Sequence, residues 1–268
     1  MAQVDIAVLG AAGRMGRMLV TAVSQVTGLR LVGATEQDGS PFLGRDAGEV
    51  AGIGPVGVAI GSQIHDGFAA GRVAIDFTLP QATRNHLQRA VEHHTGLVVG
   101  TTGLTEGDVQ QLTRAAQDIP IVFAPNFSIG VNLMFKVAAQ VASTLGETYD
   151  IEIIEAHHRH KVDAPSGTAL GLGRAVAGAM GKPLQDVAVY AREGHTGARV
   201  PGSIGFATVR GGDIVGDHTV LFAGEGERFE VTHKASSRMT FARGAVQAAL
   251  WLNGKPPGLY TMRDVLGF

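Results

Sequence analysis

The sequence predicts an α/β protein in which a doubly wound parallel sheet is joined to a second α+β domain with an open mixed sheet. Three observations lead to this fold class. Strand-like apolar segments alternate with helical ones through the first half, a glycine turn follows the first strand, and glycine-separated strands fill most of the second half. The 268 residues include no cysteine, which excludes disulfides, thiolate nucleophiles and cysteine-bound metals.

The strands of the first half are expected to be parallel, because a helix separates one strand from the next. Polar or glycine turns follow several of them, and ligands bind outside the carboxyl ends of such strands. Thr78, Thr105 and Ser128, which lie in these turns, are also expected to cap helices. The predicted strands are 4–9, 29–35, 73–77, 97–99 and 121–124, and the predicted helices are 81–93, 106–117 and 131–145.

The turn after the first strand has glycines where a dinucleotide-binding site needs them. Gly10, Gly13 and Gly16 lie between that strand and a helical pattern that runs from Met18 to Val26, which is the context of a Rossmann-like fingerprint. Glycines let the backbone approach the pyrophosphate, which then rests on the helix N-terminus. The spacing G-x-x-G-x-x-G is less common than G-x-G-x-x-G, so an ordinary tight turn is the competing interpretation.

Glu36 supplies the second part of this motif. It follows the second strand, about twenty residues beyond the glycines, where a carboxylate accepts hydrogen bonds from the adenosine ribose. The same carboxylate repels the 2′-phosphate of NADPH, and Gln37 and Asp38 offer no cation to offset that repulsion. NADH is therefore the expected preference, unless Glu36 is merely a surface glutamate.

A run of cations is the most distinctive feature of the second half. His157, His158, Arg159, His160 and Lys161 follow one another, and their mutual repulsion makes sense where the run holds an anion. Histidines also titrate near neutral pH. The site is therefore expected to bind an anion and to move a proton, although a solvated basic loop is the plainer alternative.

This run lies on a loop between a predicted strand, 149–156, and a predicted helix. Ser166 is the expected N-cap of that helix. The backbone N–H groups of Gly167 and Thr168 open it, and a helix N-terminus attracts carboxylate or phosphate. Lysine, imidazole and backbone donors are thus expected to converge on one anion.

Other kinds of partner fit less well. Arg159 and Lys161 would repel a metal ion, so no metal is expected. The formal net charge of −2 and the lack of aromatic residues among the cations argue against nucleic acid. No apolar stretch is judged long enough to span a membrane, and the N-terminus does not resemble a secretory signal. A cytoplasmic protein is expected.

The remainder of the second half is expected to form a mixed sheet with one long loop. Strands are predicted at 187–191, 203–210, 213–223 and 227–234, with the glycine-rich loop at 193–202. A final helix is predicted at 239–252, with Ser237 as its N-cap.

Taken along its length, the chain resembles the bacterial dihydrodipicolinate reductases, also called 4-hydroxy-tetrahydrodipicolinate reductases. The stretch at 155–169 is the most specific and the glycine motif the least. The matching stretches are 10–16 (GAAGRMG), 76–78 (DFT), 100–103 (GTTG), 124–132 (APNFSIGVN), 155–169 (EAHHRHKVDAPSGTA), 192–197 (REGHTG), 205–212 (GFATVRGG) and 233–241 (HKASSRMTF).

The resemblance implies the reaction. A nicotinamide hydride reduces a cyclic imine dicarboxylate to tetrahydrodipicolinate, on the diaminopimelate route to lysine. It implies that His157 is the general acid toward the ring carbon and that Lys161 donates a proton or steadies charge near the ring nitrogen. It implies that His158, Lys161, Gly167 and Thr168 hold the carboxylates. The residues implied to line the cofactor site are Gly10, Ala11, Ala12, Gly13, Arg14, Met15, Glu36, Gly100, Thr101, Thr102, Ala124, Pro125, Asn126 and Phe127.

The resemblance also implies a discontinuous dinucleotide-binding domain, 1–128 with 239–268, and a substrate-binding and oligomerisation domain, 129–238. A homotetramer built through the second sheet is implied as well. Gln37 and Leu79 stand where many or some relatives carry arginines, which weakens the case for NADPH. Because relatives often use both cofactors, NADH is expected to be preferred and NADPH still accepted.

Two rival functions remain at this point. An amino-acid or sugar dehydrogenase on the same two-domain plan would need fewer cations than the run at 157–161 provides. A non-catalytic NAD-binding redox sensor would carry a DNA-reading module or a basic stripe, and the sequence shows neither.

Overall fold

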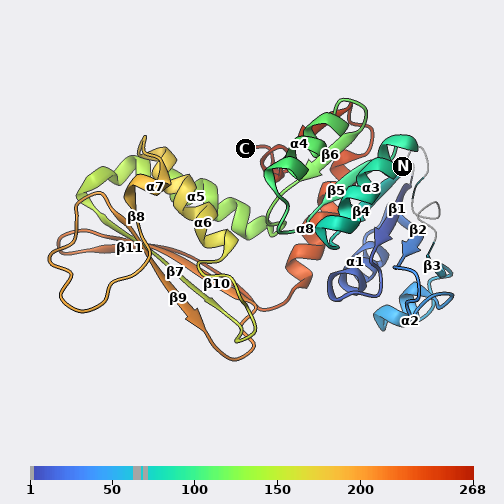
Figure 1. Cartoon of the computed structure of the whole chain (residues 1–268), viewed down its shortest axis with the longest axis horizontal. Helices are drawn as coiled ribbons and strands as arrows, with labels where there is room; N and C mark the ends of the chain where they lie inside the picture. The colour runs from blue at the N-terminus through green and yellow to red at the C-terminus, as the bar shows by residue number, and fades with distance from the viewer. Residues whose placement is uncertain (1–2, 63–67, 69–71) are drawn as a thin grey trace. The chain divides into compact units, whose positions relative to one another are not determined.

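The computed structural model describes residues 3–62, 68 and 72–268, which form two compact units (Figure 1). One unit contains the residues up to Ile129 and those from Arg238 onwards, and the other contains Gly130–Ser237. Each unit has its own sheet and its own hydrophobic core.

The first unit is built on a parallel sheet with the strand order β12-β6-β5-β4-β1-β2-β3. The predicted doubly wound sheet is therefore confirmed. β3 and β12 were not predicted, because two or three residues show no periodic pattern. The strands are β1 (Val4–Leu9), β2 (Leu29–Thr35), β3 (Ile60–Gly61), β4 (Val73–Asp76), β5 (Gly96–Val99), β6 (Pro120–Phe123) and β12 (Gly258–Tyr260).

Successive residues of the buried strands face two different cores, because side chains alternate along a strand. In β1, Ile6 and Val8 pack with α1 (Arg14–Gln25) and α8 (Met239–Leu252), whereas Ala7 and Leu9 pack on the opposite face. Helices thus cover both faces of the sheet. The helices on that opposite face are α3 (Pro80–Glu92) and α4 (Glu106–Ala115), and the two short helices are α2 (Ala47–Ala51) and α9 (Met262–Leu266).

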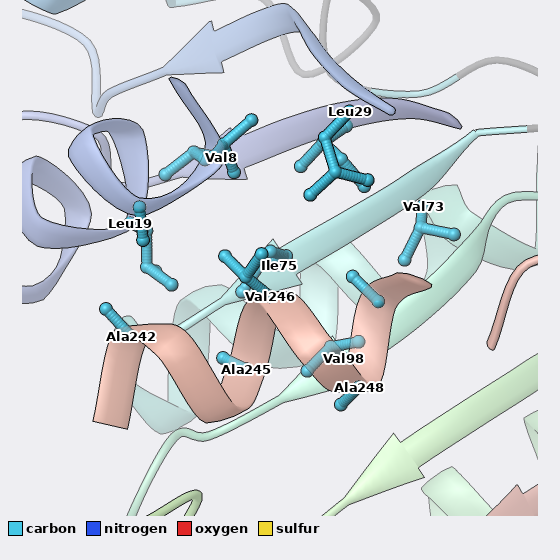
Figure 2. Close-up of a cluster of buried hydrophobic side chains, with 14 of the residues drawn as sticks. Val8, Leu19, Leu29, Val73, Ile75, Val98, Ala242, Ala245, Val246 and Ala248 are labelled. Carbon is cyan, nitrogen blue, oxygen red and sulfur yellow. The ribbon is translucent and has the colours of Figure 1, made fainter. Parts of the chain in front are cut away.

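Helix α8 comes from the far end of the chain and packs among strands of the first half. Figure 2 shows Val246 of α8 beside Ile75 of β4, within the cluster that also holds Leu19. Helix α8 lies so close to the backbone of Phe127 that a Cβ on Gly244 would lie 1.7 Å from the carbonyl oxygen of Phe127. Small residues on α8 therefore fix where the C-terminal segment joins this unit.

Among the predicted helix caps, those at Ser237 and Thr78 are wrong and that at Thr105 is confirmed. Arg238, not Ser237, occupies the N-cap position of α8. Leu79, not Thr78, occupies that of α3, because Pro80 begins the helix and the Thr78 hydroxyl is bound to Asp76. Thr105 does cap α4, where it forms a reciprocal capping box with Asp108.

The second unit has a mixed sheet with the strand order β11-β10-β7-β9-β8. β10 is antiparallel to β11 and β7, while β9 is parallel to β7 and β8, which confirms the predicted mixed sheet. Helices α5 (Ile129–Leu145) and α6 (Gly167–Ala179) share its core. Its other elements are β7 (Asp150–His157), a 3₁₀ turn (Gly146–Thr148), α7 (Leu184–Val187), β8 (Ala188–Val189), β9 (Ile204–Arg210), β10 (Gly216–Ala223) and β11 (Arg228–Ala235).

The expectation that no apolar stretch is long enough to span a membrane does not hold for one helical stretch. Ile129–Thr148, which contains α5, is long and apolar enough to cross a bilayer by length and composition alone. A single stretch of this kind is a weak indication, because core helices of soluble proteins pass the same test. Met134, Ala138 and Ala142 of α5 are buried in the core of the second unit.

Candidate active site

The predicted cofactor residues lie in loops that follow the carboxyl ends of the parallel strands. Gly10 follows β1, Glu36 follows β2, Gly100 follows β5 and Ala124 follows β6. The carboxyl ends of parallel strands share an edge, and the chain reverses its direction across the sheet between β1 and β4. Such a reversal is where open α/β sheets bind ligands.

The glycine turn and Glu36 are joined by hydrogen bonds. The backbone N–H of Ala12 donates to Oε1 of Glu36 at 3.0 Å, and that of Gln37 donates to Oε2 at 3.2 Å. Gly10 has a φ of +67°, in the left-handed region that favours glycine. A Cβ on Gly16 would lie 2.0 Å from the carbonyl oxygen of Gly10. The absence of side chains here lets strand, turn and helix pack closely.

The remaining residues of the turn divide between core and surface. Ala11 and Met15 pack against the core of the first unit, whereas Gly13 and Arg14 are exposed at the start of α1. The backbone at Gly13 and Arg14 is therefore accessible to a ligand, as a pyrophosphate site requires.

Asp76, which was not among the predicted site residues, organises the neighbouring turns. Its fully buried carboxylate accepts hydrogen bonds from the backbone N–H and hydroxyl of Thr78, at 3.0 and 2.6 Å, and lies 2.8 Å from Nδ1 of His86. Burial opposes its charge, yet the contacts with His86 and Thr78 hold the pKa of Asp76 below its ordinary value. The Thr101 hydroxyl donates to the same carboxylate at 3.3 Å.

Gly100 lies against an aromatic pair. A Cβ on Gly100 would lie 2.2 Å from Cζ of Phe77, and the Phe77 ring packs against that of Phe127 at 5.3 Å between centroids. Phe127 is only 1% exposed. Its side chain belongs to the core, so Phe127 can contribute to a cofactor site through backbone atoms.

The other predicted cofactor residues in these two turns are more varied. Ala124 is buried, Pro125 and Thr102 are exposed, and Oδ1 of Asn126 accepts a hydrogen bond from the backbone N–H of Ser128 at 2.8 Å. This contact shapes the turn after β6 just before α5 begins.

In the second unit, two buried polar residues lie at the carboxyl end of β7. Ile151, Ile153, Glu155 and His157 point to one face of the strand, because their positions differ by two. The first two residues are in the apolar core, whereas Glu155 and His157 are polar and nevertheless buried. A buried charged group at a strand end, with its partners in place, is typical of a functional site.

Glu155 is held from three directions. Arg210 on β9 binds both of its oxygens, from Nη1 to Oε2 at 2.8 Å and from Nη2 to Oε1 at 2.9 Å. The backbone N–H of Ser166 donates to Oε1 at 3.0 Å, and Nδ1 of His157 lies 2.5 Å from Oε2. Burial opposes the charge, but hydrogen bonds from Arg210 and His157 keep the pKa of Glu155 below its ordinary value.

His157 is 8% exposed and lies among groups with opposing effects. Burial lowers the pKa of His157 below its ordinary value, and Lys161 and Arg210 act in the same direction, whereas Glu155 raises it. The ring of His218 meets that of His157 edge to face, at 5.0 Å between centroids. Burial lowers the pKa of His218 to about 4, so His218 is neutral near pH 7.

The predicted anion-binding residues Lys161, Gly167 and Thr168 follow His157 along the chain. Nζ of Lys161 lies 2.8 Å from Oδ1 of Asp163, an exposed carboxylate. The structure confirms Ser166 as the N-cap of α6, since its hydroxyl accepts a hydrogen bond from the backbone N–H of Ala169 at 3.1 Å. Gly167 and Thr168 form the first turn of that helix. Lys161 and the start of α6 thus both follow β7.

No group of three or more His, Asp or Glu side chains that could hold a metal ion is found within residues 3–62, 68 and 72–268.

Two family models match the chain, one on each side of residue 128. "Dihydrodipicolinate reductase, N-terminus" matches residues 4–127, and "Dihydrodipicolinate reductase, C-terminus" matches residues 130–266. The chain belongs to the dihydrodipicolinate reductase family. This confirms the resemblance that the motifs indicated.

Individual relatives agree with the family models over nearly the full length. A 4-hydroxy-tetrahydrodipicolinate reductase of Alkalilimnicola ehrlichii is 59% identical over 262 residues, 98% of each chain. That of Magnetococcus marinus is 56% identical over 265 residues, 99% of each chain. Among solved structures, dipicolinate-bound dihydrodipicolinate reductase from Paenisporosarcina sp. TG-14 has a TM-score of 0.74 and 25% identity, with 98% of each chain covered.

Sequence reasoning did not assign Glu155, Arg210 or His218 to the site. Glu155 could have been found, because it lies two positions before His157 on a predicted strand. Arg210 and His218 could not, because they come from β9 and β10 and meet β7 only when the sheet forms.

Proposed function

We propose that the chain catalyses the reduction that gives its family its name. NAD(P)H reduces 4-hydroxy-tetrahydrodipicolinate, or the dehydrated dihydrodipicolinate, to tetrahydrodipicolinate in the diaminopimelate route to lysine. Membership of the family makes the chain an NAD(P)H-dependent oxidoreductase with a small-molecule substrate. The observation that carries the proposal is the buried Glu155–His157 pair beside Lys161 and the N-terminus of α6.

The first unit fits a dinucleotide. A Cβ would fill the space at Gly16, Gly10 has a positive φ, and Glu36 is held at the turn by Ala12. We assign the residues named above at the ends of β1, β2, β5 and β6 to hold the cofactor. When bound, the reduced nicotinamide supplies the hydride.

The second unit fits a dicarboxylate. His158, Lys161, Gly167 and Thr168 would hold the two carboxylates, since cations and a helix N-terminus both favour anions. Binding would draw Lys161 away from Asp163, a contact made at the surface. His157 would donate a proton to the ring carbon, and Lys161 would stabilise charge near the ring nitrogen.

NADH is the preferred cofactor in this proposal. Glu36 would place a negative charge beside the 2′-phosphate of NADPH, and Gln37 supplies no positive charge to offset it. NADPH would still be used, at lower affinity.

A homotetramer built through the second sheet is part of the proposal. Ile154 on β7 and Val209 on β9 are 38% and 49% exposed, on the face opposite Glu155 and Arg210. Ile154→Lys should shift the mass measured by light scattering from tetramer to smaller species. Leu250→Lys, an exposed site on α8 of the other unit, is the control that should remain tetrameric.

We also place the enzyme in the cytoplasm. Cell fractionation of the untagged protein would test this, and recovery with the membrane or outside the cell would contradict it.

The decisive experiment is turnover. Purified protein should oxidise NADH when supplied with the freshly made product of the preceding synthase, and His157→Gln should be the control with strongly reduced activity. No oxidation above background with either NADH or NADPH would reject the function and favour a non-catalytic NAD-binding protein.

A further inference from the structure

We propose that Glu155 is a positioning residue for the reaction. Its carboxylate, locked by Arg210, keeps a proton on Nδ1 of His157, so that Nε2 alone exchanges protons with the substrate. This inference rests on the proposed role of His157 as proton donor.

The contacts of Glu155 decide which atom carries the proton. A buried carboxylate with one arginine N–H on each oxygen stays ionised, and an ionised carboxylate accepts hydrogen bonds and donates none. Oε2 lies 2.5 Å from Nδ1 of His157, so the proton between them belongs to the nitrogen. Neutral His157 therefore has its lone pair on Nε2, and protonated His157 has a second N–H there.

The neighbouring strand leaves space at Nε2. Gly216 begins β10, and a Cβ there would lie 3.0 Å from Nε2 and 3.4 Å from Cδ2 of His157. A larger side chain at this position would press on the atom that must reach the substrate. Glu155 thus holds Nδ1 of His157, and the lack of a side chain at Gly216 leaves space beside Nε2 of the same ring.

The second oxygen of Glu155 ties this arrangement to the anion site. Oε1 accepts the backbone N–H of Ser166, the N-cap of α6. Because Gly167 and Thr168 follow at once, the carboxylate that orients His157 also fixes the start of the helix proposed to hold the substrate. Proton donor and anion site are therefore held in register by one side chain.

The charges around His157 give the expected effect of removing Glu155. The groups that act on the ring are Glu155 on β7, Lys161 on the following loop, Arg210 on β9 and His218 on β10. Of these four, Glu155 is the anion and favours the protonated ring, while Lys161 and Arg210 disfavour it. Without Glu155, His157 would lose its proton at lower pH and would no longer be held in one tautomer.

Glu155→Gln keeps the shape of the side chain and removes its charge. We expect kcat to fall roughly 10-fold to 10³-fold, less than the full share of a general acid. The pH at which kcat declines should move down by roughly 1–3 units, the usual effect of losing a close opposite charge. KM for the dianionic substrate should not rise, because a negative charge has been removed.

Glu152→Gln is the matched control. Glu152 lies on the same strand and is also bound by arginines, Arg192 and Arg199, but it faces the other side of the sheet and does not contact His157. Compared at the same oligomeric state, measured by light scattering, its kcat and pH profile should match those of the parent. A Glu155→Gln profile that also matches the parent would overturn the inference.

A tautomer measurement tests the same point in the unaltered protein. With ¹⁵N-labelled histidine, and His157→Gln to assign the signal, neutral His157 should show a protonated Nδ1 and an unprotonated Nε2. A proton on Nε2 of the neutral ring would overturn the inference, even if Glu155→Gln fails to fold. If the predicted tautomer is found but the parent oxidises no NADH, the proposed function fails and the positioning of the ring stands.

Discussion

The backbone N–H of Ala12 donates a hydrogen bond to the carboxylate of Glu36, with 3.0 Å between nitrogen and oxygen. This contact joins the turn after β1 to the end of β2, although the two residues are 24 positions apart. It fixes a negative charge next to the glycine turn. The side chain that shapes the turn is therefore the same one that we propose discriminates between the two nicotinamide cofactors.

Replacing Glu36 should separate these two effects. Glu36→Ala should weaken NADH binding and improve NADPH relative to NADH, since the repulsion of the 2′-phosphate is lost. Glu36→Gln should keep the hydrogen bond from Ala12 and lose only the charge. The ratio of kcat/KM for the two cofactors is the measurement. A ratio that stays at the parent value in both variants would show that the ribose lies elsewhere.

His157→Gln should lower kcat by roughly 10²–10⁴, the usual contribution of a general acid. NADH affinity, measured by fluorescence titration, should hardly change, because the residues proposed to hold the cofactor lie in the other unit. His160→Gln is the control, since His160 is exposed on the same loop. Equal losses of activity in the two variants would point to the charge of the loop and away from proton transfer by His157.

Local patterns predicted the elements, and tertiary contacts determined the details of the site. β1, β2 and α8 have the predicted limits, because apolar runs and glycines mark them in the sequence. The cationic run was visible for the same reason. The Glu155–Arg210 pair was not, because its members are 55 positions apart and meet through strand pairing.

The predicted cap at Thr78 fails for a related reason. A hydroxyl before a helix is a good cap in isolation, but the Thr78 hydroxyl binds the buried carboxylate of Asp76 instead. The α3 helix also begins at Pro80, so its N-cap position falls on Leu79. Competition of this kind depends on what is buried nearby, which the sequence does not state.

Gly16 and Gly13 should differ sharply in their tolerance of a methyl group. A Cβ on Gly16 would lie 2.0 Å from the carbonyl oxygen of Gly10 and 2.7 Å from backbone atoms of Ala11, none of which can move without shifting the turn. Gly16→Ala should lower the free energy of unfolding by about 1–3 kcal/mol, as overpacking does. A Cβ on Gly13 would lie 3.2 Å from Gly10, so Gly13→Ala should cost less.

Urea denaturation at neutral pH would compare these two variants. Gly16→Ala should also lose NADH affinity, because the turn and the start of α1 would move apart. If the two variants have equal stability, the close packing of strand and helix at this turn does not contribute as described.

Asp76 should make stability depend on pH in a defined direction. Its pKa in the folded protein is below its ordinary value, so it stabilises the fold fully above the unfolded-state pKa of about 3.9, and this contribution is lost as pH falls through the folded-state pKa. Asp76→Asn should lower the free energy of unfolding at pH 7 by roughly 3 kcal/mol, since it leaves His86 buried without its carboxylate partner. The difference between parent and variant should shrink as the pH is lowered below about 4. Denaturant titrations at several pH values, with Asp38→Asn as an exposed control, would measure it. A difference that stays constant with pH would mean that the carboxylate of Asp76 is not charged in the folded protein, and that His86 and Thr78 hold it by neutral hydrogen bonds.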